Sequence, residues 1–349
     1  MKTALKVSVL SPGLADPWAA WAPIDELAAL LVRYFNAELL LPEPQEPSSL
    51  QRLVGGSGAS YGPVRTDGGD VLIVVARMPL DLAAIRSITD CRKKFKRIVA
   101  WVTDSYFQAG FTRDTADYDA ITVTAHEDIA FVRDKFSISV HQCYQGADCL
   151  TWVPRQDVPR SIDLISFGRT PPSYHRQLQQ DFHGPDSPYL YLHSPLGNLQ
   201  GPIVQTERGM LFKVLRRTGF SLAFHLYVEP QGNRPRSTMV TSRWLESLLS
   251  GCIVAGKRPQ SRMAEEMLFW PGSTVELSDD PVIAVQELLE MLKSGDGFGQ
   301  QRRANIRHML LHHDWRFRIR QLCEIFALEV PPSLTEDLDR VRSLADTFE

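Results

Sequence analysis

Short apolar runs alternate with amphipathic segments of helical length along the chain. In the first half, the runs with a strand pattern lie at residues 5–10, 38–41, 71–76, 98–102, 121–123 and 137–143. A helical stripe after the first run consists of Ile24, Leu27, Leu30, Leu31 and Phe35, and a later helix is expected at 127–135. Residues 71–76 are apolar throughout, which is typical of a parallel strand covered on both faces. This half of the chain therefore predicts alternating strands and helices.

The same alternation resumes after a proline-bearing passage at residues 153–159. Strands are predicted at 162–167, 189–193, 222–228, 252–255 and 274–277. Helices are predicted at about 174–181, 209–217, 243–250, 282–292 and 302–326, with a shorter one near Met263. Gly251 stands where a helix that ends at Ser250 favours a left-handed residue. The capping box from Ser333 to Glu336 predicts a last helix over 334–347.

Two blocks of this alternation predict an α/β fold with two facing, Rossmann-like, doubly wound parallel-sheet domains. The predicted domains are residues 1–153 and residues 160–330, and a C-terminal helix within 333–349 can cross back to the first domain. Ligands of such sheets bind at the carboxyl ends of the strands, beside helix N-termini. With two facing domains, the expected site is the cleft between them.

Composition narrows the possible functions. Lys and Arg total 38 and Asp and Glu total 41, so the net charge of −3 argues against a general nucleic-acid-binding protein. No segment approaches the roughly 18 consecutive apolar residues of a membrane span. Residues 1–3 run directly into a strand pattern, without the features of a signal peptide. Five scattered cysteines are too few for a disulfide scaffold, so a reducing, cytoplasmic location is expected.

Residues 241–259 carry the most informative pattern. Thr241 or Ser242 can cap the N-terminus of a helix, on which Arg243 and Glu246 lie three residues apart. The unpaired N–H groups of a helix N-terminus and a planar guanidinium both favour a diphosphate. A carboxylate one turn later can accept hydrogen bonds from the two neighbouring hydroxyls of a ribose. The alternative is an ordinary amphipathic helix with a surface ion pair between the same two side chains.

The order of helix, Glu, small residues, Gly, strand and Gly-x-x-Pro resembles the nucleotide-sugar-binding signature of two-domain (GT-B) glycosyltransferases of the group 1 type. It is most similar to the spore-maturation-protein-like (CgeB-like) branch, whose Thr-x-Arg-x-x-Glu run is matched by Thr241, Arg243 and Glu246. Three further segments resemble the family in the same order: 137–148 with a Gly-x-Asp ending, 165–169 ending in Gly-Arg, and 314–318 with its Trp. The resemblance covers most of the chain from about residue 98 onward.

The resemblance implies a donor site in the second domain. Its candidate residues are Arg169, Lys213, Thr241, Ser242, Arg243 and Glu246. Glu246 would hold the ribose and Arg169 would lie near the diphosphate, while Arg243 and Lys213 are further candidate cations. One position departs from the classical pattern, because a second glutamate separated from the first by seven residues is replaced by Thr238. The retaining mechanism associated with that pair of glutamates is therefore not implied for this chain.

Candidates for the acceptor side follow the predicted strands of the first domain. Asp104 comes after the strand at 98–102, where family members often carry a His-Asp or similar pair facing the acceptor. It can act as a base or hydrogen-bond partner for an acceptor hydroxyl, or it can cap the next helix. His126, after the following strand, is either catalytic or an ordinary residue at the start of a helix. Gly13 lies in the first strand–helix turn, where backbone N–H groups can approach the donor phosphates.

Other patterns argue against competing functions. His308 and His312 share a helical face, but without a third ligand beside them solvated histidines are the better interpretation. The glycine-rich run 55–58 lacks the ending of a P-loop. No Gly-x-Gly-x-x-Gly follows the first strand, which argues against a dinucleotide oxidoreductase.

The resulting hypothesis is a glycosyltransferase of the hexosyltransferase class. It would move a sugar from a nucleoside diphosphate sugar to the hydroxyl of a glycan, a lipid-linked compound or a small molecule, with no cofactor and no divalent metal. Membrane contact would be at most peripheral, through basic residues in 92–97. Two alternatives stay open: a nucleotide-sugar epimerase of the same fold, and a non-catalytic relative that binds a partner through the cleft or around Trp18 and Trp21. Donor base and sugar, acceptor, stereochemical outcome and oligomeric state are left undetermined.

Overall fold

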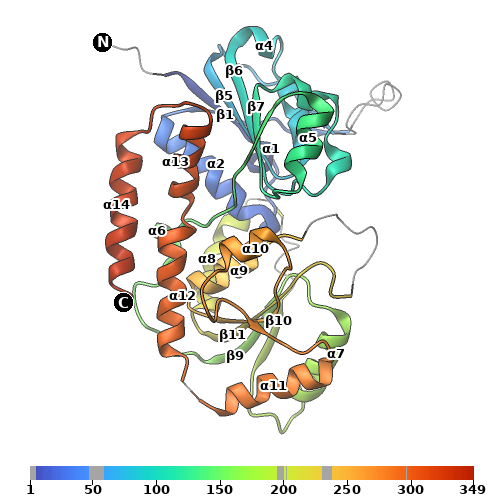
Figure 1. The fold of residues 1–349 in the computed structure, drawn as a ribbon, viewed down its shortest axis with the longest axis vertical. Helices are drawn as coiled ribbons and strands as arrows, with labels where there is room; N and C mark the ends of the chain where they lie inside the picture. Colours follow the sequence, from blue (N-terminus) through green and yellow to red (C-terminus); the bar gives the residue numbers. More distant parts are fainter. Residues whose placement is uncertain (1–4, 47–58, 195–199, 202, 230–237, 296) are drawn as a thin grey trace. The chain divides into compact units, whose positions relative to one another are not determined.

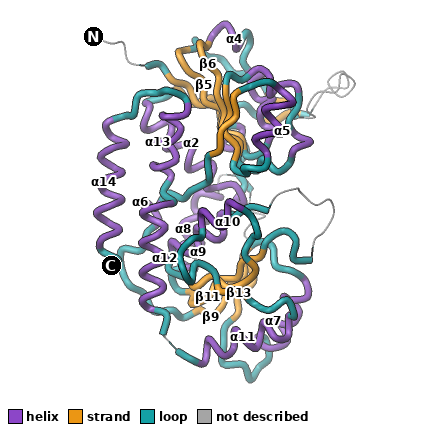
Figure 2. The backbone as a smooth tube through the Cα atoms, viewed as in Figure 1, coloured by secondary structure: helices purple, strands orange, loops and turns teal. Residues whose placement is uncertain are grey.

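The structure is a computed structural model that describes residues 5–46, 59–194, 200–201, 203–229, 238–295 and 297–349 (Figure 1). The glycine-rich run 55–58 lies outside these residues. The chain divides into two compact units, residues 1–145 with 315–337 and residues 146–314 with 338–349. Each unit is built around one parallel sheet, drawn in orange in Figure 2, with helices packed on it.

The first unit contains a six-stranded sheet in the order β2-β1-β5-β6-β7-β8, and each neighbouring pair in it is parallel. Its strands are β1 (Val7–Leu10), β2 (Glu38–Leu40), β5 (Gly69–Ala76), β6 (Phe95–Val102), β7 (Ala120–Val123) and β8 (Ser139–Gln142). A separate antiparallel pair joins β3 (Pro44–Gln45) and β4 (Ser60–Tyr61). The strand order reverses between β1 and β5, as in a doubly wound sheet.

Helices cover both faces of this sheet. They are α1 (Pro12–Ala15), α2 (Ala22–Phe35), α4 (Cys91–Lys94), α5 (Asp128–Phe136) and α13 (Trp315–Ile325), with the short helices η1 (Ala19–Trp21), η2 (Pro79–Ser87), η3 (Gln108–Gly110) and η4 (Arg113–Asp117). Val132 of α5 packs into the apolar cluster that contains Val102. Trp101 points to the opposite face because side chains alternate along a strand, and its ring meets Trp315 edge-on at 5.2 Å. The two layers bury the strands on both sides, which accounts for their continuous apolar sequence.

The second unit contains a five-stranded parallel sheet in the order β10-β9-β11-β12-β13. Its strands are β9 (Ile162–Phe167), β10 (Tyr191–Ser194), β11 (Thr218–Phe224), β12 (Ile253–Lys257) and β13 (Val275–Glu276). The order reverses between β9 and β11. The prediction of an α/β chain with two doubly wound parallel sheets is therefore confirmed.

Helices also cover both faces of the second sheet. They are α6 (Cys149–Trp152), α7 (Pro172–Phe182), α8 (Ile203–Leu215), α9 (Ser242–Leu249), α10 (Arg262–Met267), α11 (Pro281–Lys293) and α12 (Gly299–His312). The last helix, α14 (Pro332–Asp346), begins with residues of the first unit and ends with residues of the second. Leu178 of α7 and Leu288 of α11 pack with Leu222 in one apolar cluster. Leu215 of α8 packs with Ile165 in another, since these strand residues point to the other face.

The helix predicted over 302–326 is two helices in the structure. The first ends at His312 and the second begins at Trp315. The intervening backbone pairs elsewhere, because Ala147 N–H donates to the carbonyl of His313 at 2.9 Å and the Asp314 carboxylate accepts from Cys149 N–H at 3.0 Å. These bonds join segments far apart in sequence, so helical periodicity alone gave no sign of the break.

Three other predicted boundaries shift. Strand β11 begins at Thr218 rather than 222, because Thr218 pairs in register with Ile162 at the start of β9. Helix α8 begins at Ile203, six residues before the predicted start at 209. The last helix begins at Pro332, whose fixed φ suits the first helical position, so Ser333 lies inside the first turn rather than at its cap.

At Gly256 in β12, the backbone of the neighbouring strand β11 leaves no space for a side chain. Its φ is +149°, and a Cβ added there would lie 1.9 Å from the carbonyl oxygen of Ala223 in β11. Gly256→Ala is expected to cost at least about 2 kcal/mol of unfolding free energy, because the neighbouring backbone must move. Urea unfolding followed by circular dichroism measures this cost. The control Gly209→Ala, with open space around its Cβ, should be neutral or stabilising, and an equal effect of both changes would contradict the prediction.

Candidate functional site

The carboxyl ends of β9 and β11 form the point where the strand order of the second sheet reverses. Ligands of doubly wound sheets bind at such a point. Gly168 and Arg169 follow β9 directly, and His225 follows β11. Arg169 is exposed, and His225 is half-buried.

Arg243 lies against this end of β9. Its Nη1 donates to the carbonyl oxygen of Arg169 at 2.6 Å, and its guanidinium lies 5.9 Å from the ring of Phe167. A Cβ at Gly168 would lie 2.6 Å from Arg243 Nη2, and the φ of Gly168 is +77°, so only glycine fits here without strain. The structure therefore brings together Arg169 and Arg243, two of the cations predicted for the donor site.

Positive charge is concentrated at this edge of the sheet. The pKa of Arg243 is lowered to about 10, mainly by burial and also by the charge of Arg169, with Glu246 acting in the opposite direction. Burial also lowers the pKa of His225, with the charges of Lys257 and Arg169 acting in the same direction. Lys257, the last residue of β12, pairs with Asp279 at 2.8 Å. An anion bound here would relieve the repulsion among these cations.

Helix α9 presents its N-terminus beside Arg243. Thr241 occupies the N-cap position with extended backbone, and Ser242 is the first helical residue. Within the described residues, the Thr241 hydroxyl makes no capping hydrogen bond to the first turn. The helix is followed by Gly251 with a φ of +74°, which confirms the predicted left-handed residue.

Glu246, one turn further along α9, is almost completely buried, at 4% exposed. Its carboxylate forms an ion pair with Arg208 of α8, which is 3% exposed. Sequence reasoning missed Arg208, because the helix was predicted to begin one residue after it. Lys213, the residue predicted to add a cation from this helix, is exposed in the last turn of α8. Thus Arg208, and not Lys213, is the cation of α8 that meets Glu246.

Asp104 follows β6 at the carboxyl edge of the first sheet. Its carboxylate accepts a hydrogen bond from the indole N–H of Trp21 at 3.0 Å. The pKa of Asp104 is raised to about 6, mainly by burial, with the hydrogen bond from Trp21 acting against the rise and the charge of Asp81 adding to it. A carboxyl with this pKa changes protonation close to neutral pH, which suits a general base.

Gly13 and Arg77 occupy the point where the strand order of the first sheet reverses. Arg77 follows β5, is 7% exposed, and donates to the carbonyl of Gly13, to that of Asp16 at 2.8 Å and to the carboxylate of Asp25. A Cβ at Gly13 would lie 2.6 Å from Arg77 Nε. Gly13 therefore makes room for a buried arginine that sequence reasoning did not single out.

His126 is exposed in the turn after β7. The neighbouring buried acid is Asp128, which accepts hydrogen bonds from Ser105 Oγ at 2.7 Å and Gln108 Nε2 at 2.6 Å. Burial raises the pKa of Asp128. Asp128 is a second acid at this edge that the sequence did not reveal, because its position as the first residue of α5 resembles that of any helix start.

In the described part of the chain, no group of three or more His, Cys, Asp or Glu side chains is arranged to hold a metal ion. His308 and His312 stack with ring centroids 5.6 Å apart, and His308 also stacks on Trp270. Every helix among the described residues is too short or too polar to cross a bilayer.

Comparison with known proteins finds similarity to glycosyltransferases. Residues 177–324 match a family model described as glycosyl transferase-like. The chain is similar to HepE from Anabaena in complex with UDP (9% identity, 93% of this chain and 100% of that chain, TM-score 0.49). It is also similar to a glycosyltransferase from Rickettsia africae (9% identity, 92% and 98%, TM-score 0.48) and to a UDP-glucosyltransferase from Polygonum tinctorium (12% identity, 94% and 100%, TM-score 0.43). No curated protein matches this chain.

The Arg208–Glu246 pair yields a prediction on stability. Arg208→Met leaves a buried carboxylate without its cation and is expected to lower the unfolding free energy by about 3–5 kcal/mol. The double variant Arg208→Met/Glu246→Met should recover much of the lost unfolding free energy, because neither side chain of the pair then buries a charge. Urea unfolding measures both, with Arg262→Met in the exposed Arg262–Glu266 pair as the control, expected to cost less than about 1 kcal/mol. A cost for Arg208→Met no larger than that of the control would contradict the prediction.

Proposed function

We propose that this protein is a glycosyltransferase of the hexosyltransferase class, with the GT-B plan, that takes a sugar from a nucleoside diphosphate sugar. The observation that carries the proposal is the group Arg169, Arg243 and Glu246 at the reversal point of the second sheet. Most of this group lies inside the segment that matches the glycosyl transferase-like family model. The earlier resemblance to the CgeB-like branch supports the same proposal.

The donor is proposed to bind through its diphosphate and its ribose. Arg243 is fixed by its bond to the Arg169 carbonyl, so its charge is in place before the diphosphate arrives. The exposed side chain of Arg169 and the first N–H groups of α9 add further donors for phosphate oxygens. Glu246 is proposed to accept from the ribose hydroxyls, and its pairing with Arg208 favours the ionised form of the carboxylate.

The first unit is proposed to supply the acceptor side. Asp104 would remove the proton from the acceptor hydroxyl, and its raised pKa makes it a stronger base than an ordinary aspartate. His126 is kept as an exposed second candidate for proton transfer at the same edge. Transfer breaks the bond between the sugar and the diphosphate, forms a bond from the sugar to the acceptor oxygen, and releases the nucleoside diphosphate.

Arginine charge is proposed to stabilise the leaving diphosphate in place of a divalent metal. The group at β9 supplies cations at the position where diphosphate charge develops. This finer proposal predicts that transfer persists when metal ions are chelated. The alternative of an epimerase predicts turnover of the nucleotide sugar with no acceptor present.

Affinities for nucleotides and for pyrophosphate distinguish the proposed role of Arg243, at the diphosphate, from that of Glu246, at the ribose. Isothermal titration of UDP, GDP, ADP and inorganic pyrophosphate measures affinity for the full chain. Arg243→Ala should weaken both the preferred nucleotide and pyrophosphate by about 10- to 100-fold, because it removes charge-assisted bonds to the diphosphate. Glu246→Gln should weaken the nucleotide about tenfold and leave pyrophosphate unchanged, because it acts on the ribose.

The control for these titrations is Arg176→Ala, an exposed arginine on α7. It should leave all affinities unchanged. The donor proposal is overturned if none of the nucleotides binds, and the ribose role is overturned if Glu246→Gln affects pyrophosphate as much as the nucleotide.

The pH dependence of transfer tests Asp104. A base with a pKa near 6 is protonated below that pH, so the turnover rate should rise with pH through about 6 and level off above it. Asp104→Asn should lower turnover by about 10²- to 10⁴-fold and leave nucleotide affinity unchanged. Asp16→Asn, which alters the acid bonded to the neighbouring Trp18, is the control and should keep the acidic limb. A rate for Asp104→Asn close to that of the parent protein would exclude this residue as the base.

A further inference from the structure

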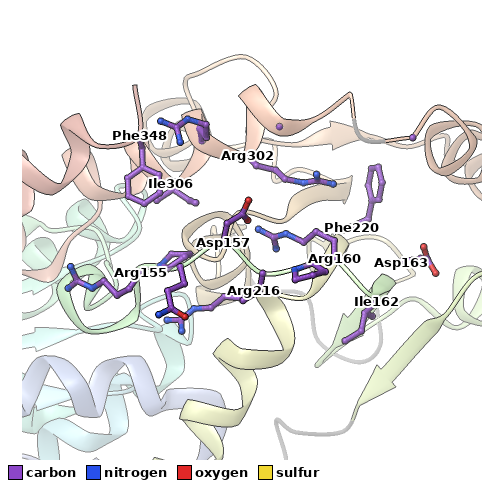
Figure 3. Close-up of a pocket in the computed structure, with 18 of the residues that line it drawn as sticks. Arg155, Asp157, Arg160, Ile162, Asp163, Arg216, Phe220, Arg302, Ile306 and Phe348 are labelled. Atoms are coloured by element: carbon purple, nitrogen blue, oxygen red, sulfur yellow. The ribbon is translucent and has the colours of Figure 1, made fainter.

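A cavity of about 1040 Å³ opens at the amino ends of the strands in the second unit, opposite the ends that carry Arg169 and His225. Figure 3 shows its walls: the passage from Pro154 to Arg160, the starts of β9 and β11, helix α12 and the C-terminal residues through Phe348. This volume is slightly above the usual range for small-molecule sites, about 300–1,000 Å³. The cavity therefore has room for a ligand of substantial size.

Positively charged side chains outnumber negatively charged ones in the lining of the cavity. The lining contains two aspartates, Asp157 and Asp163, and five arginines, Arg155, Arg160, Arg216, Arg302 and Arg303. The protein as a whole carries a net charge of −3, so this excess is local and runs against the overall balance. A concave surface with one sign of charge attracts ligands of the opposite sign.

Several of these arginines donate hydrogen bonds to backbone carbonyl oxygens. Arg160 donates to the carbonyls of Leu215, Thr218 and Ser250 at 3.0–3.1 Å. Arg216 donates to the carbonyl of Trp152 at 2.6 Å. Carbonyl oxygens carry no net charge, so these bonds leave the positive charges of Arg160 and Arg216 in place.

Arg216 carries a buried N–H group in addition to the one that donates to Trp152. Its Nε lies buried and, among the described residues, has no hydrogen-bond partner. Burial lowers the pKa of Arg216, and the charges of Arg155 and Arg217 add to the effect. Burial raises the pKa of the Cys252 thiol, and the positive charges of Arg160 and Arg302 both act to lower it, so both guanidiniums lie near this thiol.

Helix α12 adds a second source of positive potential. It is 14 residues long and begins at Gly299, which lines the cavity. Its N-cap residue is Phe298, whose side chain has no atom that can accept from the first-turn N–H groups. The partial positive charge of this helix N-terminus therefore adds to the field of the arginines.

The remaining wall is apolar. It includes Ile162, Phe220, Met291, Leu292, Ile306 and Phe348. Guanidinium groups bind phosphate oxygens in pairs of parallel hydrogen bonds, whereas an apolar wall favours a hydrocarbon or ring portion of the same ligand. Inorganic phosphate would use only the first of these two features.

We propose that this cavity is a second ligand site, distinct from the donor site, and that it binds organic phosphates with an apolar portion. The phosphate lies among Arg155, Arg216 and Arg302, and the apolar portion lies against Phe220 and Phe348. This site does not depend on the proposed glycosyl transfer, because its residues lie at the other end of the sheet from Arg243 and Glu246.

Isothermal titration of the full chain tests the proposal with three probes: phenyl phosphate, hexyl phosphate and inorganic phosphate. At least one organic phosphate should bind about tenfold more tightly than inorganic phosphate, and the better of the two identifies a ring or a chain as the apolar portion. Arg302→Glu should weaken that binding at least about tenfold by reversing a charge in the wall. Arg155→Glu, at an exposed position, provides a second test should the first variant fail to fold.

Two further variants locate the binding. Arg243→Ala should leave the affinity for the organic phosphate unchanged, although it weakens nucleotides at the donor site. Arg176→Glu, a charge reversal on α7 outside the cavity, should also have no effect. The proposal is overturned if no organic phosphate binds, if inorganic phosphate binds as tightly, or if Arg243→Ala abolishes binding while Arg302→Glu and Arg155→Glu retain it.

Discussion

The candidate donor site depends on the close approach of one guanidinium to one stretch of backbone. Arg243 reaches the carbonyl of Arg169 only because Gly168 has no side chain and adopts a positive φ. The contact places two arginines side by side at the reversal point of the second sheet. Their repulsion costs free energy in the absence of an anion, and a bound diphosphate would remove that cost. The proposed donor site would thus carry its positive charge before the diphosphate binds.

In the second unit, buried and less buried charged side chains have different kinds of partner. The buried carboxylate of Glu246 has a dedicated cation in Arg208, because an isolated charge at 4% exposure would be prohibitively unfavourable. Arg243, in contrast, donates to the backbone carbonyl of Arg169, which carries no net charge. In the proposed donor site the phosphates would meet Arg169 and Arg243, while the charge of Glu246 is neutralised by Arg208 within the core.

Helix α9 physically links the two positively charged ends of this sheet. Its N-terminus carries Arg243, and the carbonyl of Ser250 after its last turn accepts from Arg160 in the wall of the second cavity. The first unit has a related arrangement at its own reversal point, where Arg77 holds the turn around Gly13. In both units a glycine, which has no side chain, makes room for an arginine.

The amino-acid sequence by itself determined the two blocks of strands and helices, since apolar periodicity is a local property that survives in any well-packed context. It also indicated Arg243 and Glu246, because their spacing on one helix is fixed by helical geometry. Only the tertiary structure decided which cation meets Glu246, where the helix at 302–326 breaks, and that arginines gather at the amino ends of the strands. Arg208 and Ala147 bond to partners distant in the chain, and Arg302 lines a cavity beside residues distant in the chain. Such neighbours follow from packing rather than from any local pattern.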